Sequence, residues 1–105
     1  MKYEWKNIYH WWNKKKILNS ILNKTTVYSV TLFGSYAKNS ADKNSDLDFI
    51  IDTRETLMGF KLYSLISKIE ETFKKRVDVF EKSEIIEKSK IDEEIKKTGI
   101  VVYEK

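Results

Sequence analysis

Two acidic side chains, Asp46 and Asp48, are separated by one residue in a segment with the composition of a β-strand. Because side chains alternate across a strand, both carboxylates project from one face, with their Cα atoms roughly 6.6 Å apart. Two carboxylates this close repel each other, and a divalent cation relieves the repulsion. Two metal ions roughly 3.5–4 Å apart stabilise the attacking and leaving oxygens in phosphoryl-type transfer. The pair therefore predicts metal-dependent chemistry at a phosphate.

A glycine-serine pair, Gly34-Ser35, ends the apolar stretch that precedes these acids in the chain. Glycine permits unusual backbone angles and lets backbone N–H groups approach a phosphate closely, while Ser35 adds a hydroxyl donor. If residues 35–39 begin a helix, its positive N-terminal end would point at the same phosphates. We predict that Gly34 and Ser35 lie against a phosphate group.

A third carboxylate, Asp78, lies in the short strand-like segment RVDVF, where Val77 and Val79 face the other way. A buried acid without a partner is costly, so Asp78 is expected at the sheet edge or beside the metal. There it could complete the metal shell and accept the proton of an attacking hydroxyl.

Each of these features also has a non-functional interpretation. A glycine-serine pair is an ordinary turn in most sequences, and an Asp-x-Asp pair is usually solvated. The four residues at this spacing arise by chance in roughly one chain of this length per several hundred, which favours the functional interpretation.

The elements that must position these residues follow from hydrophobic periodicity. Apolar residues recur every three or four positions over residues 9–23 and 58–73, which predicts two amphipathic helices. Strands are predicted at residues 26–33, 46–52, 76–80 and 100–103 from their β-branched and aromatic content. A helical stretch is expected after Ser83 with a break near Ser89, where a capping box opens a last helix that ends at Gly99. The alternation of strands and helices indicates an α/β fold with a small sheet covered by helices, and leaves the strand order open.

The size and composition of the chain restrict its function. Its 105 residues correspond to a single domain over residues 1–105, and there is no cysteine and only one histidine, His10, expected at the surface. Carboxylates are therefore the plentiful metal ligands, which suits hard cations such as magnesium. No membrane span or secretory signal is recognisable, so we expect no membrane association and a cytoplasmic location.

The net charge of +4 concentrates in two basic runs, Lys14-Lys15-Lys16 and Lys74-Lys75-Arg76. Such runs could attract phosphate-bearing ligands, although lysine-rich faces on small domains are usually solvated surface. No strand shows the aromatic and basic face typical of nucleic-acid-binding domains, so direct nucleic-acid binding is not expected.

Around Gly34-Ser35 and Asp46-Leu47-Asp48 the sequence resembles the minimal nucleotidyltransferase family. These proteins are small relatives of the DNA polymerase β-like and kanamycin nucleotidyltransferase fold. The family's glycine-serine, alanine-basic-glycine and Ser-Asp-x-Asp segments correspond to GSYAKN at residues 34–39 and SDLD at residues 45–48. Its third acid corresponds to Asp78, and residues 93–103 are similar to its C-terminal segment. Lys38 replaces the usual arginine and loses its bidentate fork, and Asn39 replaces the usual glycine.

The resemblance implies a small mixed β-sheet flanked by α-helices, with Gly34, Ser35 and Lys38 at the nucleotide. It implies ATP as the AMP donor and two Mg²⁺ ions held by Asp46, Asp48 and Asp78. It also implies a partner, since such proteins often serve as antitoxins that bind a HEPN-domain toxin and adenylylate its tyrosine. The alternative is an antitoxin of the same fold that neutralises its partner by binding alone; the presence of all three acids favours catalysis.

For the N-terminal tryptophans and for Tyr36 the sequence supports two interpretations. Trp5, Trp11 and Trp12 indicate either a protein contact surface or packing of the first helix. Tyr36 either stacks near the nucleotide or packs in the core, and Asp52 is assigned to a helix cap.

Overall fold

One mixed sheet with helices on both faces forms the molecule. The computed structural model describes residues 8–38, 40, 42, 44–57 and 59–105, with side chains from residue 14 onward. The helices are α1 (Ile8–Leu22), α2 (Gly59–Phe73) and α3 (Lys90–Thr98); the strands are β1 (Ser29–Phe33), β2 (Leu47–Asp52), β3 (Val77–Glu81) and β4 (Ile100–Glu104). The strand order is β3-β2-β1-β4, with β1 antiparallel to both neighbours and β2 parallel to β3. The predicted fold class is confirmed.

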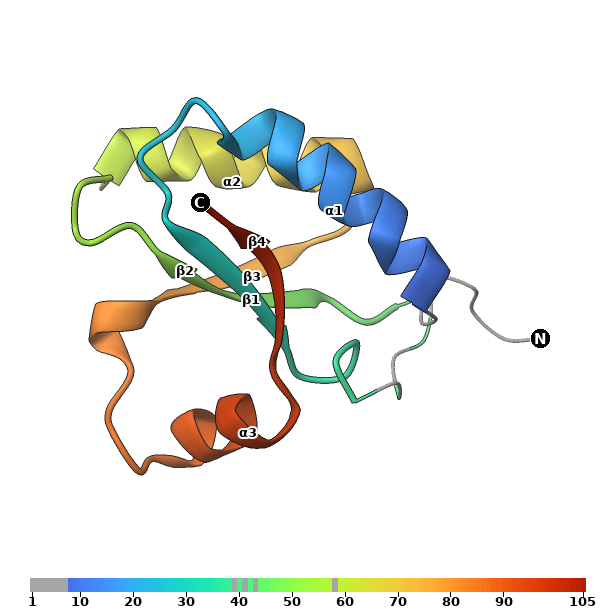
Figure 1. Cartoon of the computed structure of the whole chain (residues 1–105), viewed down its shortest axis with the longest axis vertical. Coiled ribbons are helices and arrows are strands. Elements are labelled where there is room, and N and C mark those ends of the chain that lie inside the picture. The colour runs from blue at the N-terminus through green and yellow to red at the C-terminus, as the bar shows by residue number, and fades with distance from the viewer. Residues whose placement is uncertain (1–7, 39, 41, 43, 58) are drawn as a thin grey trace.

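Helices α1 and α2 cover one face of the sheet, and α3 lies on the other side (Figure 1). The core lies under α1 and α2 and contains Leu18, Leu22, Leu65 and Ile69 from the helices and Val30, Leu32, Phe49 and Ile51 from the strands. Because side chains alternate, the intervening strand residues point to the opposite side, which we call the α3 face. The α3 face carries Ser29, Thr31, Phe33, Asp48, Ile50, Asp78 and Phe80. The two strand residues predicted to be catalytic, Asp48 and Asp78, therefore lie on the face away from the main core.

Helix α3 begins and ends as its sequence predicts. The Ser89 side chain accepts a hydrogen bond from the backbone N–H of Asp92 at 3.2 Å. The Asp92 carboxylate in turn accepts from the backbone N–H of Lys88 at 2.8 Å, one residue before the cap. At the other end, a Cβ on Gly99 would lie 2.5 Å from the carbonyl oxygen of Ile95, so a close approach of the backbone requires glycine there.

The helical stretch predicted directly after Ser83 is wrong. Only one 3-10 turn, η2 (Lys82–Glu84), follows β3, and a single turn, in which the Ser89 N–H donates to the Ile86 carbonyl at 3.1 Å, precedes α3. Lys88 has φ +67°, a left-handed conformation that cannot continue an α-helix. The strand expected from residue 26 also begins later, at Ser29, because the Thr25 hydroxyl closes a turn with Leu22 at 2.7 Å.

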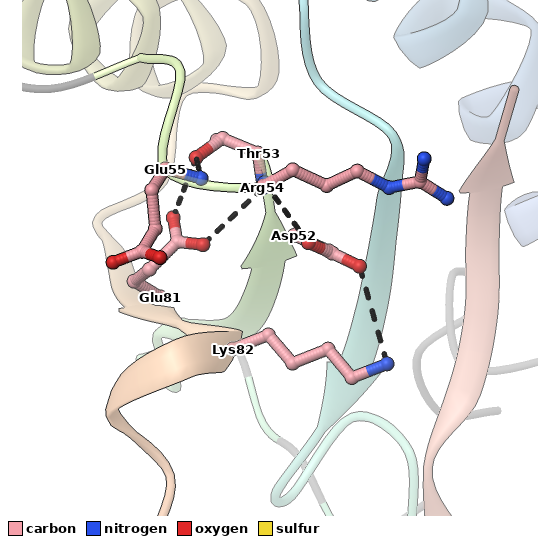
Figure 2. Close-up of polar contacts among 6 residues, drawn as sticks. All are labelled: Asp52, Thr53, Arg54, Glu55, Glu81 and Lys82. Carbon is pink, nitrogen blue, oxygen red and sulfur yellow. Dashed lines mark hydrogen bonds and ion pairs between the residues drawn. The ribbon is translucent and has the colours of Figure 1, made fainter.

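The assignment of Asp52 to a helix cap is also wrong, because Asp52 orders the turn that follows β2. One Asp52 oxygen accepts from the backbone N–H of Arg54 at 3.0 Å and the other lies 4.0 Å from the Lys82 ammonium (Figure 2). Beside it, the Glu81 carboxylate accepts from the backbone N–H of Thr53 at 3.2 Å and from its hydroxyl at 3.0 Å. These bonds join the C-terminal ends of β2 and β3.

Some predictions fall on parts of the chain that the structure does not describe. Trp5 and Asn39 lie outside the described residues, as do the side chains of His10, Trp11 and Trp12. No helix in the described ranges is long and apolar enough to cross a membrane.

Candidate active site

Gly34 brings the end of β1 into direct contact with Asp48. Its φ of +77° lies in the left-handed region, which glycine adopts without steric cost. A Cβ at Gly34 would overlap Oδ2 of Asp48 and lie 3.1 Å from its Cγ. Glycine is therefore required here both for the backbone turn and for the space that the carboxylate occupies.

The parallel register of β2 and β3 sets Asp48 directly beside Asp78. The two side chains share a hydrogen bond, and Asp46 lies just before β2. Burial raises the pKa of Asp48 to about 6, followed in importance by the negative charges of Asp78, Asp46 and Glu94 and by the Asp78 hydrogen bond. The Asp48 carboxylate therefore loses its proton less readily than a free aspartate, because its charge is disfavoured by burial and by the neighbouring acids.

The donor set fits a hard cation, because all three predicted ligands are carboxylates and their mutual repulsion favours any positive charge between them. Within the described residues, however, no three acidic, histidine or cysteine side chains are already arranged to hold a metal ion. The direct pair is Asp48 and Asp78, which share a hydrogen bond, while Asp46 acts on Asp48 through its charge.

The segment after Gly34 is a series of turns. The backbone N–H of Lys38 donates to the Gly34 carbonyl at 3.0 Å, and that of Ser40 to the Ser35 carbonyl at 2.9 Å. The Lys38 bond has the spacing of a single α-helical turn, and the described residues 35–38 form turns and not the start of a longer helix. The Ser40 bond spans five residues and so closes a wider ring than a helical bond.

Tyr36 packs in the core, which decides between its two interpretations. Its side chain is only 2% exposed, and its hydroxyl lies 3.4 Å from the Asp42 carbonyl and 3.3 Å from the Ser45 carbonyl. Burial, with the charges of Asp42 and Asp46, raises the pKa of this phenol, which stays protonated as a donor. The Lys75 ammonium also donates to the Ser45 carbonyl, at 3.3 Å. Together these bonds fix the loop that carries Asp46.

Glu94 of α3 is a neighbour of the site that sequence reasoning missed. Its carboxylate lies 3.7 Å from the Lys38 ammonium, and its charge acts on Asp48. No local pattern marks this residue, because its position depends on how α3 crosses the sheet. Lys38, the predicted phosphate contact, is therefore beside the acids and already ion-paired.

One lysine from each basic run, Lys14 and Lys75, lies within electrostatic reach of the other. The Lys14 ammonium lies 4.8 Å from the centre of the Phe73 ring, and burial and the nearby charge of Lys75 lower its pKa. Lys15 and Lys16 are exposed, as a solvated surface predicts, whereas Lys14 and Lys75 are half-buried. The solvated-surface interpretation is thus wrong for Lys14 and Lys75.

The sequence profile described as "Polymerase beta, Nucleotidyltransferase" matches residues 15–105, which include the turn at Gly34 and all three acids. The chain belongs to this nucleotidyltransferase family. It is 32% identical over 71 residues to putative protein adenylyltransferase MJ0126 of Methanocaldococcus jannaschii, covering 68% of this chain and 72% of the relative. It is 38% identical over 66 residues to putative protein adenylyltransferase MJ0435 of the same organism, covering 63% and 70%.

Solved structures share the fold of this nucleotidyltransferase at lower sequence identity. A toxin-antitoxin crystal structure with AMP-PNP has a TM-score of 0.69 and 19% identity, covering 87% of this chain and 73% of the other. A tri-AMPylated Shewanella oneidensis HEPN toxin in complex with its MNT antitoxin has a TM-score of 0.63 and 17% identity, covering 90% and 73%. The nucleotidyltransferase fold predicted from the motif is confirmed.

Proposed function

We propose that this nucleotidyltransferase moves AMP from ATP to a hydroxyl of a HEPN-domain toxin and so acts as its antitoxin. The observation that carries the proposal is the corner of the sheet where the Gly34 turn, Asp48 and Asp78 come together. The relatives named as putative protein adenylyltransferases support adenylyl transfer to a protein. The similar structures with AMP-PNP and with an AMPylated HEPN toxin support the donor and the partner.

The turn at residues 34–38 is the proposed site for the triphosphate. Backbone N–H groups after Gly34 and the Ser35 hydroxyl are donors for phosphate oxygens. Lys38 adds a positive charge that its present partner, Glu94, can release, because this ion pair is 3.7 Å long and both side chains are partly exposed.

Asp46, Asp48 and Asp78 are the proposed ligands of two Mg²⁺ ions. When bound, the ions neutralise charge on the phosphates and on the attacking and leaving oxygens. Asp78 comes from a different strand than the other two acids and is exposed, so an incoming hydroxyl can reach it. Asp78 would accept the hydroxyl proton while the oxygen bonds to the α-phosphorus and pyrophosphate leaves.

Calorimetric titration with ATP and transfer of labelled AMP to the co-expressed toxin test this proposal together. Asp46→Ala with Asp48→Ala should abolish magnesium-dependent ATP binding, because the phosphates then lack a cation to hold them. Asp78→Asn should leave ATP binding largely intact and lower transfer roughly a hundredfold or more, the range for loss of a general base. Glu71→Gln is the control, since Glu71 is an exposed acid of α2, which covers the opposite face of the sheet, and its loss should change neither measurement.

The possible results separate catalysis from occlusion. ATP binding that survives in excess chelator, or in the Asp46 and Asp48 double variant, would refute the metal site. If the double variant still neutralised the toxin as well as the wild type, the protein would be an antitoxin that acts by binding alone. Loss of ATP binding in Asp78→Asn would make Asp78 a ligand of the nucleotide-bound metal.

A further inference from the structure

A pocket of about 250 Å³ lies on the α3 face of the sheet, next to the proposed active site. Its floor is formed by Ser29, Thr31 and Ile50, and its walls include Ile85 and Ile95. Ile85 comes from the turns after β3, and Ile95 from α3. The pocket is thus roofed by the same helix that contributes Glu94 to the active site.

The pocket and the acids are neighbours on one continuous surface. Ile50 follows Asp48 by two positions on the same strand face, so their Cα atoms are roughly 6.6 Å apart. Phe33 pairs with Asp48, and Phe80 pairs with Ile50. The Phe33 and Phe80 rings contact each other edge to face, with centroids 5.7 Å apart. An apolar surface therefore leads from the acids to the pocket floor.

We propose that this pocket receives the purine base of the nucleotide whose phosphates lie at the acids, an inference that rests on the proposed function. The volume is below the roughly 300–1,000 Å³ of pockets that hold whole drug-sized ligands, so the pocket takes one ring system. Isoleucine side chains on the floor and walls offer apolar contact to the flat faces of a base. Ser29 and Thr31 carry hydroxyls that donate and accept, which suits the amino group and ring nitrogens of adenine.

Charge at the pocket indicates which end of the nucleotide enters. Glu87 and Asp92 line it with carboxylates. The cation that lines it, Lys82, lies 4.0 Å from Asp52. A triphosphate would be repelled by these acids, whereas a neutral base is not. The phosphates therefore belong at Gly34 and the base in the pocket.

Two neighbouring isoleucines allow a matched test of this orientation. Ile85 lines the pocket, whereas Ile86 is 74% exposed and is not among its lining residues. Ile85→Trp should fill the pocket and weaken magnesium-ATP binding at least tenfold, with the affinity for inorganic tripolyphosphate unchanged. Ile86→Trp should leave both affinities at wild-type values. Thr31→Val keeps the shape of the side chain and removes its hydroxyl, so it should weaken ATP roughly two- to tenfold.

Adenosine provides a readout that does not depend on metal or on transfer. In excess chelator, adenosine should shift the NMR amide signals of Thr31 and Ile50 in the wild type and in Ile86→Trp, and not in Ile85→Trp. Circular dichroism and thermal melting confirm that each variant is folded.

Several results would overturn the pocket assignment. Equal weakening of ATP and tripolyphosphate in Ile85→Trp would mean that the variant disturbs the phosphate site. Unchanged ATP binding with reduced transfer would assign the pocket to the acceptor. Wild-type binding of ATP without any adenosine shift at Thr31 would overturn the inference and leave the proposed function intact. Failure of the wild type to bind either ATP or tripolyphosphate would refute the proposed function itself.

Discussion

Replacing Gly34 with alanine tests whether this glycine is needed for the position of Asp48 as well as for the backbone. At φ +77° an alanine pays the left-handed penalty of roughly 1–2 kcal/mol. The added Cβ also overlaps Oδ2 of Asp48 and lies 3.1 Å from Cγ and 3.3 Å from Cβ of that residue. Since the overlapping atom is the end of a side chain, rotation of Asp48 relieves the clash at little further cost in stability. That rotation breaks the hydrogen bond to Asp78 and removes a proposed metal ligand.

Gly59 provides a matched control within the same chain. Its φ is +59°, also left-handed, yet a Cβ there would meet no atom within 4 Å. Gly59→Ala should therefore carry the same backbone penalty and leave the acids undisturbed. For a domain of this size, about 1 kcal/mol lowers the melting temperature by roughly 4–8 °C. We expect both variants to be destabilised by similar amounts.

The two variants should differ in function. Thermal unfolding gives the stability loss, and calorimetry gives the affinity for magnesium-ATP. Gly34→Ala should lose most magnesium-dependent ATP binding and AMP transfer, while Gly59→Ala keeps both near wild-type values at temperatures where it is folded. Equal activity in the two variants would refute the argument that Gly34 is needed for the space beside Asp48.

Three further predictions concern charges at the site. In chelator, Asp48 keeps its proton up to a pH of about 6 in the folded protein, against 3.8 for the free side chain, because burial disfavours its charge. The folded state therefore binds this proton more tightly than the unfolded state, so Asp48→Asn should be more stable than the wild type above pH 6. The difference in the free energy of unfolding, measured by urea titration, should vanish toward pH 4. A difference that stays constant with pH would contradict this. Glu94→Gln should tighten ATP binding by up to about fivefold, because the exposed ion pair between Glu94 and Lys38 contributes about 0.2–1 kcal/mol and no longer competes for the lysine. Weaker ATP binding in this variant, measured by calorimetry, would show that the pair helps to hold the nucleotide. Lys38→Ala should weaken the binding of ATP more than that of AMP.

Local sequence patterns predicted most of the secondary structure. Helix α2 and the four strands were found because their periodicity is a local property of the chain. Strand alternation predicted that Asp48 shares no face with Phe49, which is fully buried in the core. The strand order stayed open, because pairing between strands depends on contacts distant in sequence. That Asp78 joins Asp48 at one site followed only from the family resemblance.

The remaining features of the site depend on tertiary placement. Glu94 approaches Lys38 only because α3 crosses the face of the sheet opposite the main core. Lys75 was interpreted as solvated surface because a charge run is usually exposed, yet it donates to the Ser45 carbonyl thirty residues earlier in the chain. Tyr36 could not be assigned from its neighbours, since its burial depends on the loop that folds back over it.

Contacts at both ends of the β2-β3 pair fix the register that places Asp48 beside Asp78. Asp48 and Asp78 meet only in the observed register, because a shift by one residue would turn Asp78 toward the main core and Val79 toward Asp48. At one end, the backbone N–H of Leu47 donates to the Arg76 carbonyl at 2.9 Å. At the other end, two hydrogen bonds from Thr53 to Glu81 fix the same register (Figure 2). Thr53 is fully buried, so a register shift would leave its hydroxyl and N–H without these acceptors in a place that water does not reach. The bonds far from the acids therefore oppose the slip that would separate Asp48 from Asp78.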